Sequence, residues 1–135
     1  MKSSVMSNIR SFARDPRGTI LVAFAILIPV VITSVGMAVD LGQSYLVRTR
    51  LGGALDAAAL AGAASSIEED EIRTNIENFF ENNYPPEKIG MAYDLTVTVS
   101  DNIVDVSARA DYPTTFMRII GIDTVTVYRD TSIQR

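Results

Sequence analysis

Few of the ionisable side chains in this sequence are suited to catalysis or metal binding. The chain contains neither histidine nor cysteine, and these residues supply most general bases, thiol nucleophiles and transition-metal ligands. Its only lysines are Lys2 and Lys88, and Lys88 has no serine beside it in a nucleophile context. The carboxylates Asp94, Asp105 and Asp111 follow the alternating pattern of a solvated sheet face. The sequence therefore predicts no catalytic residue, no metal site and no cofactor, and we expect a protein that is not an enzyme.

The overall charge narrows the classes of partner. The chain has 135 residues with 16 acidic and 12 basic side chains, a formal net charge of -4. Nucleic-acid binding depends on a basic surface, so this balance argues against a nucleic-acid partner. The glycines at Gly52-Gly53 are not followed by the Gly-Lys-Ser/Thr of a phosphate-binding loop. No small-molecule substrate is evident.

The strongest feature is an apolar run over residues 19–39 that contains no charged side chain. As a helix this run would be about 30 Å long, which is the thickness of a bilayer's hydrocarbon core. The residues before it are mostly basic: Lys2, Arg10, Arg14 and Arg17, with Asp15 as the one acid. Because basic flanks stay in the cytoplasm, we expect three parts: residues 1–18 as a cytoplasmic basic leader, 19–39 as a transmembrane segment and 40–135 as a periplasmic domain.

Two other interpretations of the apolar run stay open. Gly36-Met37-Ala38 offers small residues to a signal peptidase, although the run is longer than the roughly 7–15 apolar residues of a signal peptide. A buried helix of a soluble protein is the third possibility, but so small a core could hardly surround a helix that is apolar on every side. A retained anchor in the inner membrane of a bacterium is the preferred interpretation.

The helical pattern continues beyond the apolar run to about Ala64. Leucine, tyrosine and alanine recur at steps of three and four residues, which predicts a buried face made of Leu41, Tyr45, Leu51, Leu55 and Ala58–Ala59. We expect one long helix from about Gly18, apolar in its first half and amphipathic in its second. Pro29 falls inside it and is tolerated in lipid as a kink.

Small residues recur along this helix at a spacing of four in two rows, first Ala38 and Gly42, then Gly53, Ala57 and Ala61. Such a row lets a second helix approach closely, so these residues are candidates for helix packing. For the second row we prefer the interpretation that Gly53 to Ala61 seat the helix on the protein's own sheet.

A second helix and a small sheet complete the predicted fold. Ser66 and Glu69 have the spacing of a capping box, which starts a helix that ends near Asn83. Its predicted buried residues are Ile72, Ile76, Phe79 and Phe80. Apolar residues then alternate with polar ones in three stretches, which predicts about three antiparallel strands: Leu95 to Ser100, Val104 to Arg109 and Asp123 to Tyr128.

Between the last two strands, Pro113 to Gly121 predicts a short helix ended by glycine. Its apolar residues are too many for an open loop, so we expect some to cover the sheet or touch the membrane surface: Phe116, Met117, Ile119 and Ile120. The predicted fold is α+β with a pilin-like layout, a long first helix followed by a second helix and a small sheet.

These residues resemble a known family. Arg14-Asp15-Pro16-Arg17-Gly18 leads into the apolar run, which ends in Val39-Asp40-Leu41-Gly42 and is followed by Ala54-Leu55-Asp56-Ala57-Ala58-Ala59-Leu60-Ala61. This pattern is similar to the TadE/TadG-like family of Flp (tight adherence, Tad) pilus-assembly proteins. Tyr84-Pro85 and Pro113 to Asp123 also resemble the membrane-proximal region of TadG-like members. The resemblance implies an inner-membrane protein that works with other Tad/Flp pilus-assembly components or pilins, with lipid as its other partner.

The resemblance also raises the question of proteolytic processing. TadE-like pseudopilins are cut after a glycine that has a glutamate five positions later, whereas Gly18 is followed at that position by Ala23. We therefore expect the leader to stay attached and favour the TadG-like branch. The von Willebrand factor A-like region of longer TadG-like proteins is not carried over to this chain.

Three functions remain open on this evidence. The preferred one is a membrane-anchored assembly component, and the second is a minor pilin cut between Gly18 and Thr19 and incorporated into the fibre. The third is a secreted, adhesin-like domain released by signal cleavage.

Overall fold

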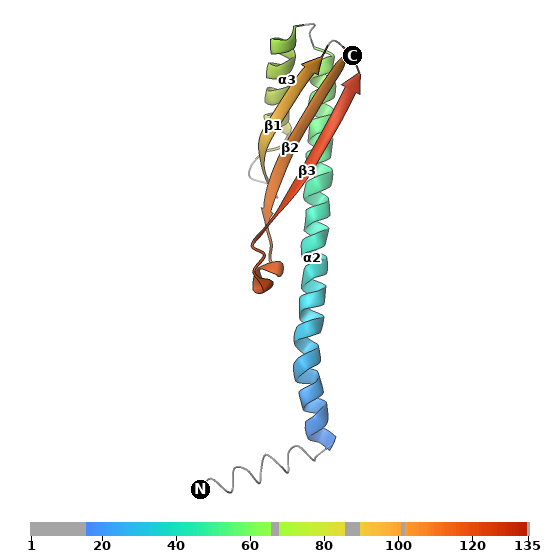
Figure 1. Cartoon of the computed structure of the whole chain (residues 1–135), viewed down its shortest axis with the longest axis vertical. Coiled ribbons are helices and arrows are strands. Elements are labelled where there is room, and N and C mark those ends of the chain that lie inside the picture. Colours follow the sequence, from blue (N-terminus) through green and yellow to red (C-terminus); the bar gives the residue numbers. More distant parts are fainter. Residues whose placement is uncertain (1–15, 66–67, 86–89, 101, 135) are drawn as a thin grey trace. The chain divides into compact units, whose positions relative to one another are not determined.

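The computed structural model describes residues 16–65, 68–85, 90–100 and 102–134. The chain divides into two compact units, Met1–Ala38 and Val39–Arg135, and one helix, α2 (Pro16–Ala63), runs from the first into the second. The other elements all belong to the second unit (Figure 1): α3 (Glu69–Asn83), β1 (Met91–Ser100), β2 (Ile103–Pro113), the 3₁₀ helix η1 (Met117–Ile120) and β3 (Thr124–Gln134). This order confirms the predicted α+β layout of a long helix, a second helix and a three-stranded antiparallel sheet.

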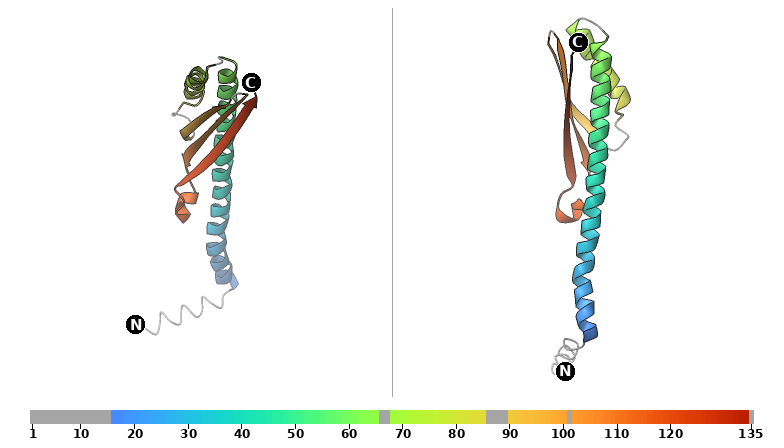
Figure 2. Two further views of the ribbon diagram at one scale, coloured as in Figure 1. Left: turned by 45° about the horizontal axis from the view of Figure 1, so that its top comes forward. Right: turned by 90° about the vertical axis from the view of Figure 1, so that its right-hand side faces the viewer.

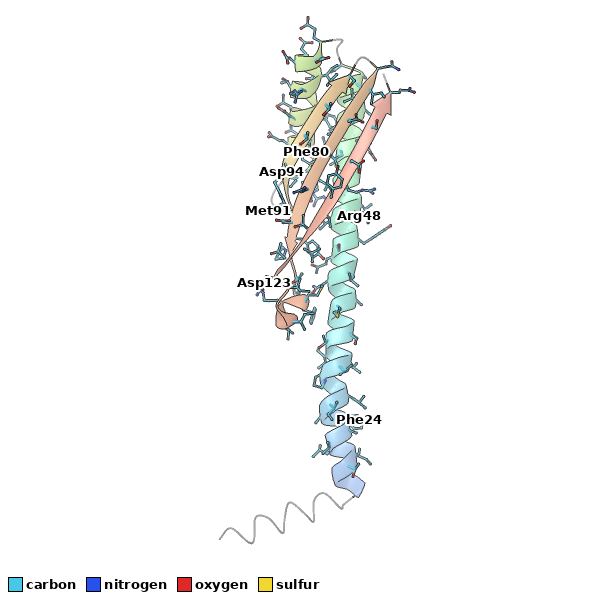
Figure 3. All side chains as sticks on the ribbon, viewed as in Figure 1. Phe24, Arg48, Phe80, Met91, Asp94 and Asp123 are labelled. Atoms are coloured by element: carbon cyan, nitrogen blue, oxygen red, sulfur yellow. The ribbon has the colours of Figure 1, made fainter. Side chains whose placement is uncertain are left out.

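In the first unit, α2 presents apolar side chains such as Phe24 to its surroundings (Figure 3). Pro29 lies inside the helix without ending it. Nearby hydroxyl groups are satisfied within the helix, since Thr33 donates to the carbonyl of Pro29 and Ser34 to that of Val30, both at 2.8 Å. By length and composition this is one helix capable of crossing a membrane.

The sheet of the second unit has the strand order β1-β2-β3, with both neighbouring pairs antiparallel. The β2–β3 pairing is continuous from Ile103↔Gln134 to Pro113↔Thr124. The β1–β2 pairing shifts between Tyr93 and Thr96, where Asp94 adopts a positive φ of 53°. This irregularity bends β1 near its start, as β-bulges do.

The C-terminal half of α2 lies along one face of the sheet, which Figure 2 shows close to edge-on. The core between them combines alternate residues of β2 with small or branched residues of α2, and residues of α3, β1 and β3 complete it. It consists of Val47, Leu51, Ala54, Leu55, Ala58, Ala59, Ile72, Ile76, Phe80, Tyr84, Val97, Val104, Val106, Ala108, Ala110, Tyr112 and Val127. Every second residue of β2 from Val104 to Tyr112 is buried, as the period of two requires.

Three residues of the predicted core are exposed instead. Leu41 and Tyr45 lie on the surface of α2, and Val47 takes the buried position. Val47, Leu51 and Leu55 are spaced by four residues and share one helix face, and neither Leu41 nor Tyr45 falls on that row. In α3, Ile72, Ile76 and Phe80 form the buried row in the same way, and the predicted Phe79 is exposed.

Several predicted boundaries also differ. The N-cap of α3 is Glu68, and the predicted cap, Ser66, lies outside the described residues. Three acids, Glu69 to Glu71, fill the first turn, where the helix dipole favours negative charge. Strand β3 continues six residues beyond the predicted end at Tyr128 because backbone pairing with β2 extends it past its apolar alternation.

Two glycines of α2, Gly62 and Gly53, allow a matched test of how α2 packs against α3. An added Cβ at Gly62 would lie 2.8 Å from Cδ1 of Ile76 and 3.2 Å from the backbone oxygen of Ile72, whereas at Gly53 it would meet nothing within 4 Å. We expect Gly62→Ala to destabilise the fold by about 1–3 kcal/mol through overpacking. Gly53→Ala should stabilise it by about 0.5–1 kcal/mol because alanine is the better helix former.

Thermal unfolding of the full chain in detergent, followed by circular dichroism, measures both effects. Equal shifts in Tm for the two variants would contradict the placement of Gly62 against α3.

Candidate functional site

The candidate site forms around Asp40, the only charged residue within the apolar sequence from Thr19 to Tyr45. Asp40 lies seven residues before Val47 and therefore on the face of α2 that is turned toward the sheet. The residue is fully buried. A buried carboxylate is costly unless hydrogen bonds or ion pairs satisfy its oxygens, so its partners determine what this site is.

Backbone N–H groups at the start of η1 supply these partners. The N–H of Thr115 donates to Oδ1 of Asp40 at 2.9 Å, and those of Phe116 and Met117 donate to Oδ2 at 2.9 and 2.6 Å. The hydroxyl of Tyr112 donates to the main-chain carbonyl of Asp40 at 3.0 Å. One residue of α2 thus holds both the end of β2 and the connection that follows it.

The connection itself, residues 114–123, is closed by its own hydrogen bonds, and we call it the η1 loop. The N–H of Thr114 donates to the carbonyl of Asp123 at 2.9 Å, and the hydroxyl of Thr114 donates to the carbonyl of Ile122. Gly121 ends η1 with a φ of 87°, a conformation that glycine adopts without steric cost. This confirms the predicted short helix ended by glycine.

The site keeps Asp40 ionised. Burial by itself would raise the pKa of Asp40, but the N–H groups of Met117, Thr115 and Phe116 lower this pKa below its ordinary value. Hydrogen bonds from backbone amides stabilise the charged form of a carboxylate. The ionised carboxylate of Asp40 therefore joins a helix to a loop through hydrogen bonds. Because it is buried, this carboxylate is not accessible to water as an acid or a base.

The predicted helix-packing residues divide between several surroundings. Ala38, in the first unit, is exposed. In the second unit Gly42 and Gly53 are exposed, with open space beyond them. Ala57 and Ala61 are half-buried, and Ala61 lines a shallow pocket with Asn75 and Asn78 of α3. Gly53 therefore does not seat the helix on its own sheet.

Gly42 and Gly53 belong to an exposed surface that we call the outer face of α2. Its residues recur at three- and four-residue steps, and Asp56 is its charged member: Gly42, Leu46, Thr49, Gly53, Asp56, Ala57 and Leu60. Leu46 and Leu60 are both more than half exposed. The face lies opposite the core row of Leu51 and Leu55, and the described part of the chain leaves most of it exposed.

The predicted processing site, Gly18 and Thr19, lies in the first turns of α2. Lys2 and Lys88 lie outside the described residues.

The acids of the strands are on or near the exposed side of the sheet. Asp111 accepts hydrogen bonds from the hydroxyls of Tyr93 at 3.1 Å and Thr126 at 2.5 Å. Asp94 lies 3.8 Å from Arg109, with both side chains more than half exposed. Asp105 is also exposed. Among the described residues, no group of three or more acids, histidines or cysteines is placed to hold a metal ion.

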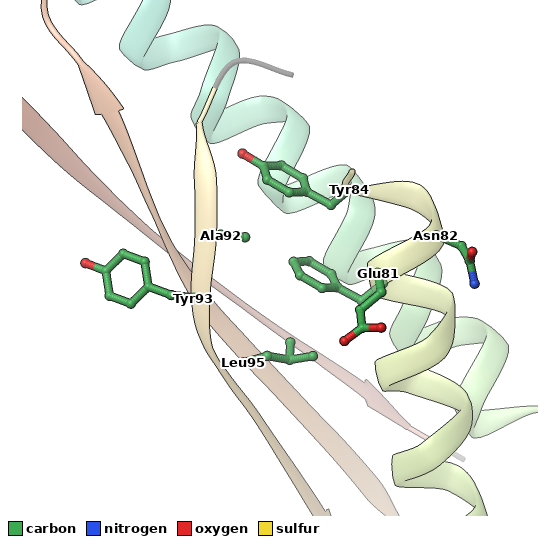
Figure 4. Close-up of a pocket in the computed structure, with 7 residues that line it drawn as sticks. Glu81, Asn82, Tyr84, Ala92, Tyr93 and Leu95 are labelled. Atoms are coloured by element: carbon green, nitrogen blue, oxygen red, sulfur yellow. The ribbon is translucent and has the colours of Figure 1, made fainter. Parts of the chain in front are cut away.

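A pocket of about 560 Å³ lies between α3 and β1 (Figure 4). Its described lining is Phe80, Glu81, Asn82, Tyr84, Ala92, Tyr93 and Leu95. Tyr84 stacks on Phe80 with ring centroids 5.6 Å apart, and Arg50 lies 5.1 Å above the Tyr84 ring. Burial raises the pKa of Tyr84, and Arg50 opposes that shift. These contacts fasten the end of α3 to α2 and bring no acid–base pair together.

Asp40, Tyr112 and Thr114 were not recognised as site residues from sequence alone. The available signal was a lone aspartate inside an apolar helix pattern, because such a residue requires buried hydrogen-bond partners. Its partners are backbone groups 75 to 77 residues away, and no side-chain type marks them in the sequence.

The chain combines a long helix, apolar in its first half, with a small α+β unit. Residues 18–65 match the family described as putative Flp pilus-assembly TadE/G-like. The match covers the apolar half of α2, Asp40 and the outer face, and it confirms the family resemblance found in the sequence. No curated protein and no solved structure matches the chain.

The hydrogen bonds of Asp40 predict a specific dependence on pH. Because the pKa of Asp40 is lowered in the folded state, its stabilising effect is complete above the ordinary carboxyl range and is lost as the pH falls through the lowered value. Asp40→Asn should lower the Tm at neutral pH. The NH2 group of the asparagine would face backbone N–H groups, and two donors cannot form a hydrogen bond with each other. The difference in Tm between wild type and variant should shrink toward pH 3.

Thermal unfolding of the full chain between pH 7 and pH 3 measures this difference. The matched control is Asp105→Asn, because Asp105 is exposed on β2. A difference in Tm between wild type and Asp40→Asn that stays constant across this range would contradict an ionised Asp40 in the folded state.

Proposed function

We propose that this chain is a non-catalytic, single-pass membrane component of a Tad/Flp-type pilus assembly system. The observation that carries the proposal is the family match over residues 18–65, together with a helix long and apolar enough to cross a bilayer. The family is a structural one that serves pilus assembly, which agrees with a chain whose ionised buried residue fastens a loop. The proposed partners are inner-membrane lipid and other Tad/Flp components or pilins.

In this proposal residues 19–39 span the inner membrane with residues 1–18 in the cytoplasm and 40–135 in the periplasm. The basic side chains before Thr19 support this orientation. The TadG-like branch is the preferred assignment because Ala23 replaces the glutamate of processed pseudopilins. A new N-terminal ammonium at Thr19 would then lack a partner from this chain, and an unpaired charge is costly near a bilayer.

The outer face of α2 supports a second candidate, the minor pilin. Gly42 and Gly53 leave open space on an exposed helix surface, and small residues let neighbouring helices pack closely. Cleavage after Gly18 would place this helix in a fibre, whereas retention of the leader would keep it beside partner helices in the membrane. The secreted, adhesin-like domain would instead begin at or after Val39.

The N-terminus of the native protein distinguishes these candidates. We expect the intact mass to correspond to a chain that retains the residues before Gly18 and to be found in the inner-membrane fraction. A periplasm-specific reporter fused after Arg135 should be active. A native chain that starts at Thr19 in sheared pilus fractions would establish the minor pilin, and one that starts at Val39 or later would establish the secreted domain.

The outer face of α2 can be tested separately. Gly53→Leu adds volume where the chain itself has nothing within 4 Å, so the Tm should change little while co-purification with other pilus-assembly components falls. Asn78→Leu on the exposed side of α3 is the matched control and should leave co-purification unchanged. Equal co-purification of both variants would show that no helix packs at Gly53.

A further inference from the structure

The η1 loop exposes three isoleucines within four residues. Ile119 is 73% exposed, Ile120 52% and Ile122 39%, although Phe116 and Met117 in the same loop are half-buried. Hydrophobic patches that stay exposed on a folded unit mark contact sites for proteins or membranes. The question is which partner covers this one.

The bonds to Asp40 determine where the loop can be. Asp40 follows Val39 directly, and Val39 is the last residue of the apolar run proposed to span the membrane. Three N–H groups of the loop lie within 2.9 Å of the Asp40 carboxylate. The loop is therefore held at the residue where the chain leaves the hydrocarbon core.

The hydrogen bonding of the loop suits an apolar environment. Besides the three donors to Asp40, Ile119 donates to Phe116, Gly121 to Arg118 and Ile122 to Met117, at 3.0 to 3.1 Å. Backbone groups that enter lipid must be satisfied within the protein, and these six N–H groups are.

The charges of the second unit are compatible with an η1 loop that lies at the membrane surface. The exposed charges of the η1 loop are Arg118 and Asp123, which have opposite signs and lie 3.7 Å apart. Asp123, on the loop side of the sheet, is labelled in Figure 3. The acidic first turn of α3 follows the end of α2, about 35 Å along that helix from Asp40, so these acids are kept away from anionic lipid headgroups.

We propose that the η1 loop inserts Ile119 and Ile120 into the headgroup–acyl boundary of the bilayer, as a second membrane contact beside the spanning helix. This inference rests on the proposed anchoring of residues 19–39. Arg118, which is exposed beside Asp123, places a cationic group next to the apolar contact, as interfacial membrane segments do. Such a contact would fix the orientation of the second unit above the membrane, because a spanning helix alone leaves rotation about its axis free.

The absence of cysteine from the chain makes a direct test possible. Single variants Ile119→Cys, Asn102→Cys and Leu27→Cys of the full chain would carry an environment-sensitive fluorophore. Each would be reconstituted into phosphatidylethanolamine–phosphatidylglycerol vesicles with and without lipids that carry a shallow or a deep spin label. Asn102 is an exposed residue of the β1–β2 turn, and Leu27 is an exposed residue of the apolar helix.

We expect the probe at position 119 to show blue-shifted emission and to lose intensity with the shallow spin label. The probe at 102 should show neither effect, and the probe at 27 should be quenched by the deep label. If the probe at 27 is in lipid but that at 119 is aqueous, the loop insertion is wrong and the anchor stands. If the probe at 27 is aqueous, the anchoring itself fails, and the loop proposal fails with it.

A second chain on the loop would give a different pattern. Blue-shifted emission at position 119 without spin-label quenching, and dependent on the protein-to-lipid ratio, would show that another copy covers the isoleucines. That outcome also overturns the lipid contact.

Discussion

The buried carboxylate of Asp40 is the interaction on which the arrangement of the second unit depends. It compensates for the loss of hydration by accepting three backbone N–H bonds from the connection between β2 and β3. Because the hydroxyl of Tyr112 holds the carbonyl of the same residue, the end of β2 and the η1 loop share one fixed point on α2. Without this point, three orphan donors at the start of η1 would have no partner within the chain.

The two faces of helix α2 have different surroundings. Toward the sheet it presents Leu51 and Leu55 together with small residues, which let the helix approach the strands and α3 closely. On the other side the outer face is exposed and has open space at Gly42 and Gly53. Small residues on an exposed helix face leave room for a second helix to approach closely.

The described carboxylates differ in their surroundings. Asp40 is buried and accepts backbone hydrogen bonds, Asp94 and Asp111 have local partners, and others such as Asp105 are exposed. The pocket between α3 and β1 is lined mainly by aromatic and apolar groups. Residues 18–65 match the family described as putative Flp pilus-assembly TadE/G-like, and within this chain the hydrogen bonds of Asp40 hold α2 and the η1 loop together.

The sequence by itself indicated the elements and the resemblance to the family that residues 18–65 match. Hydrophobic periods of 3.6 and 2 are local properties, so the long helix, the second helix, the three strands and the glycine that ends η1 could be predicted from them. The tertiary structure decided which helix face is buried, since Leu41 and Val47 are both apolar and only packing selects Val47. It also decided the role of Asp40. The backbone amides that donate to its carboxylate lie more than 70 residues away in the chain, and no particular side-chain type marks them in the sequence. Local patterns carry no information about such distant pairings, and only the folded chain brings them together.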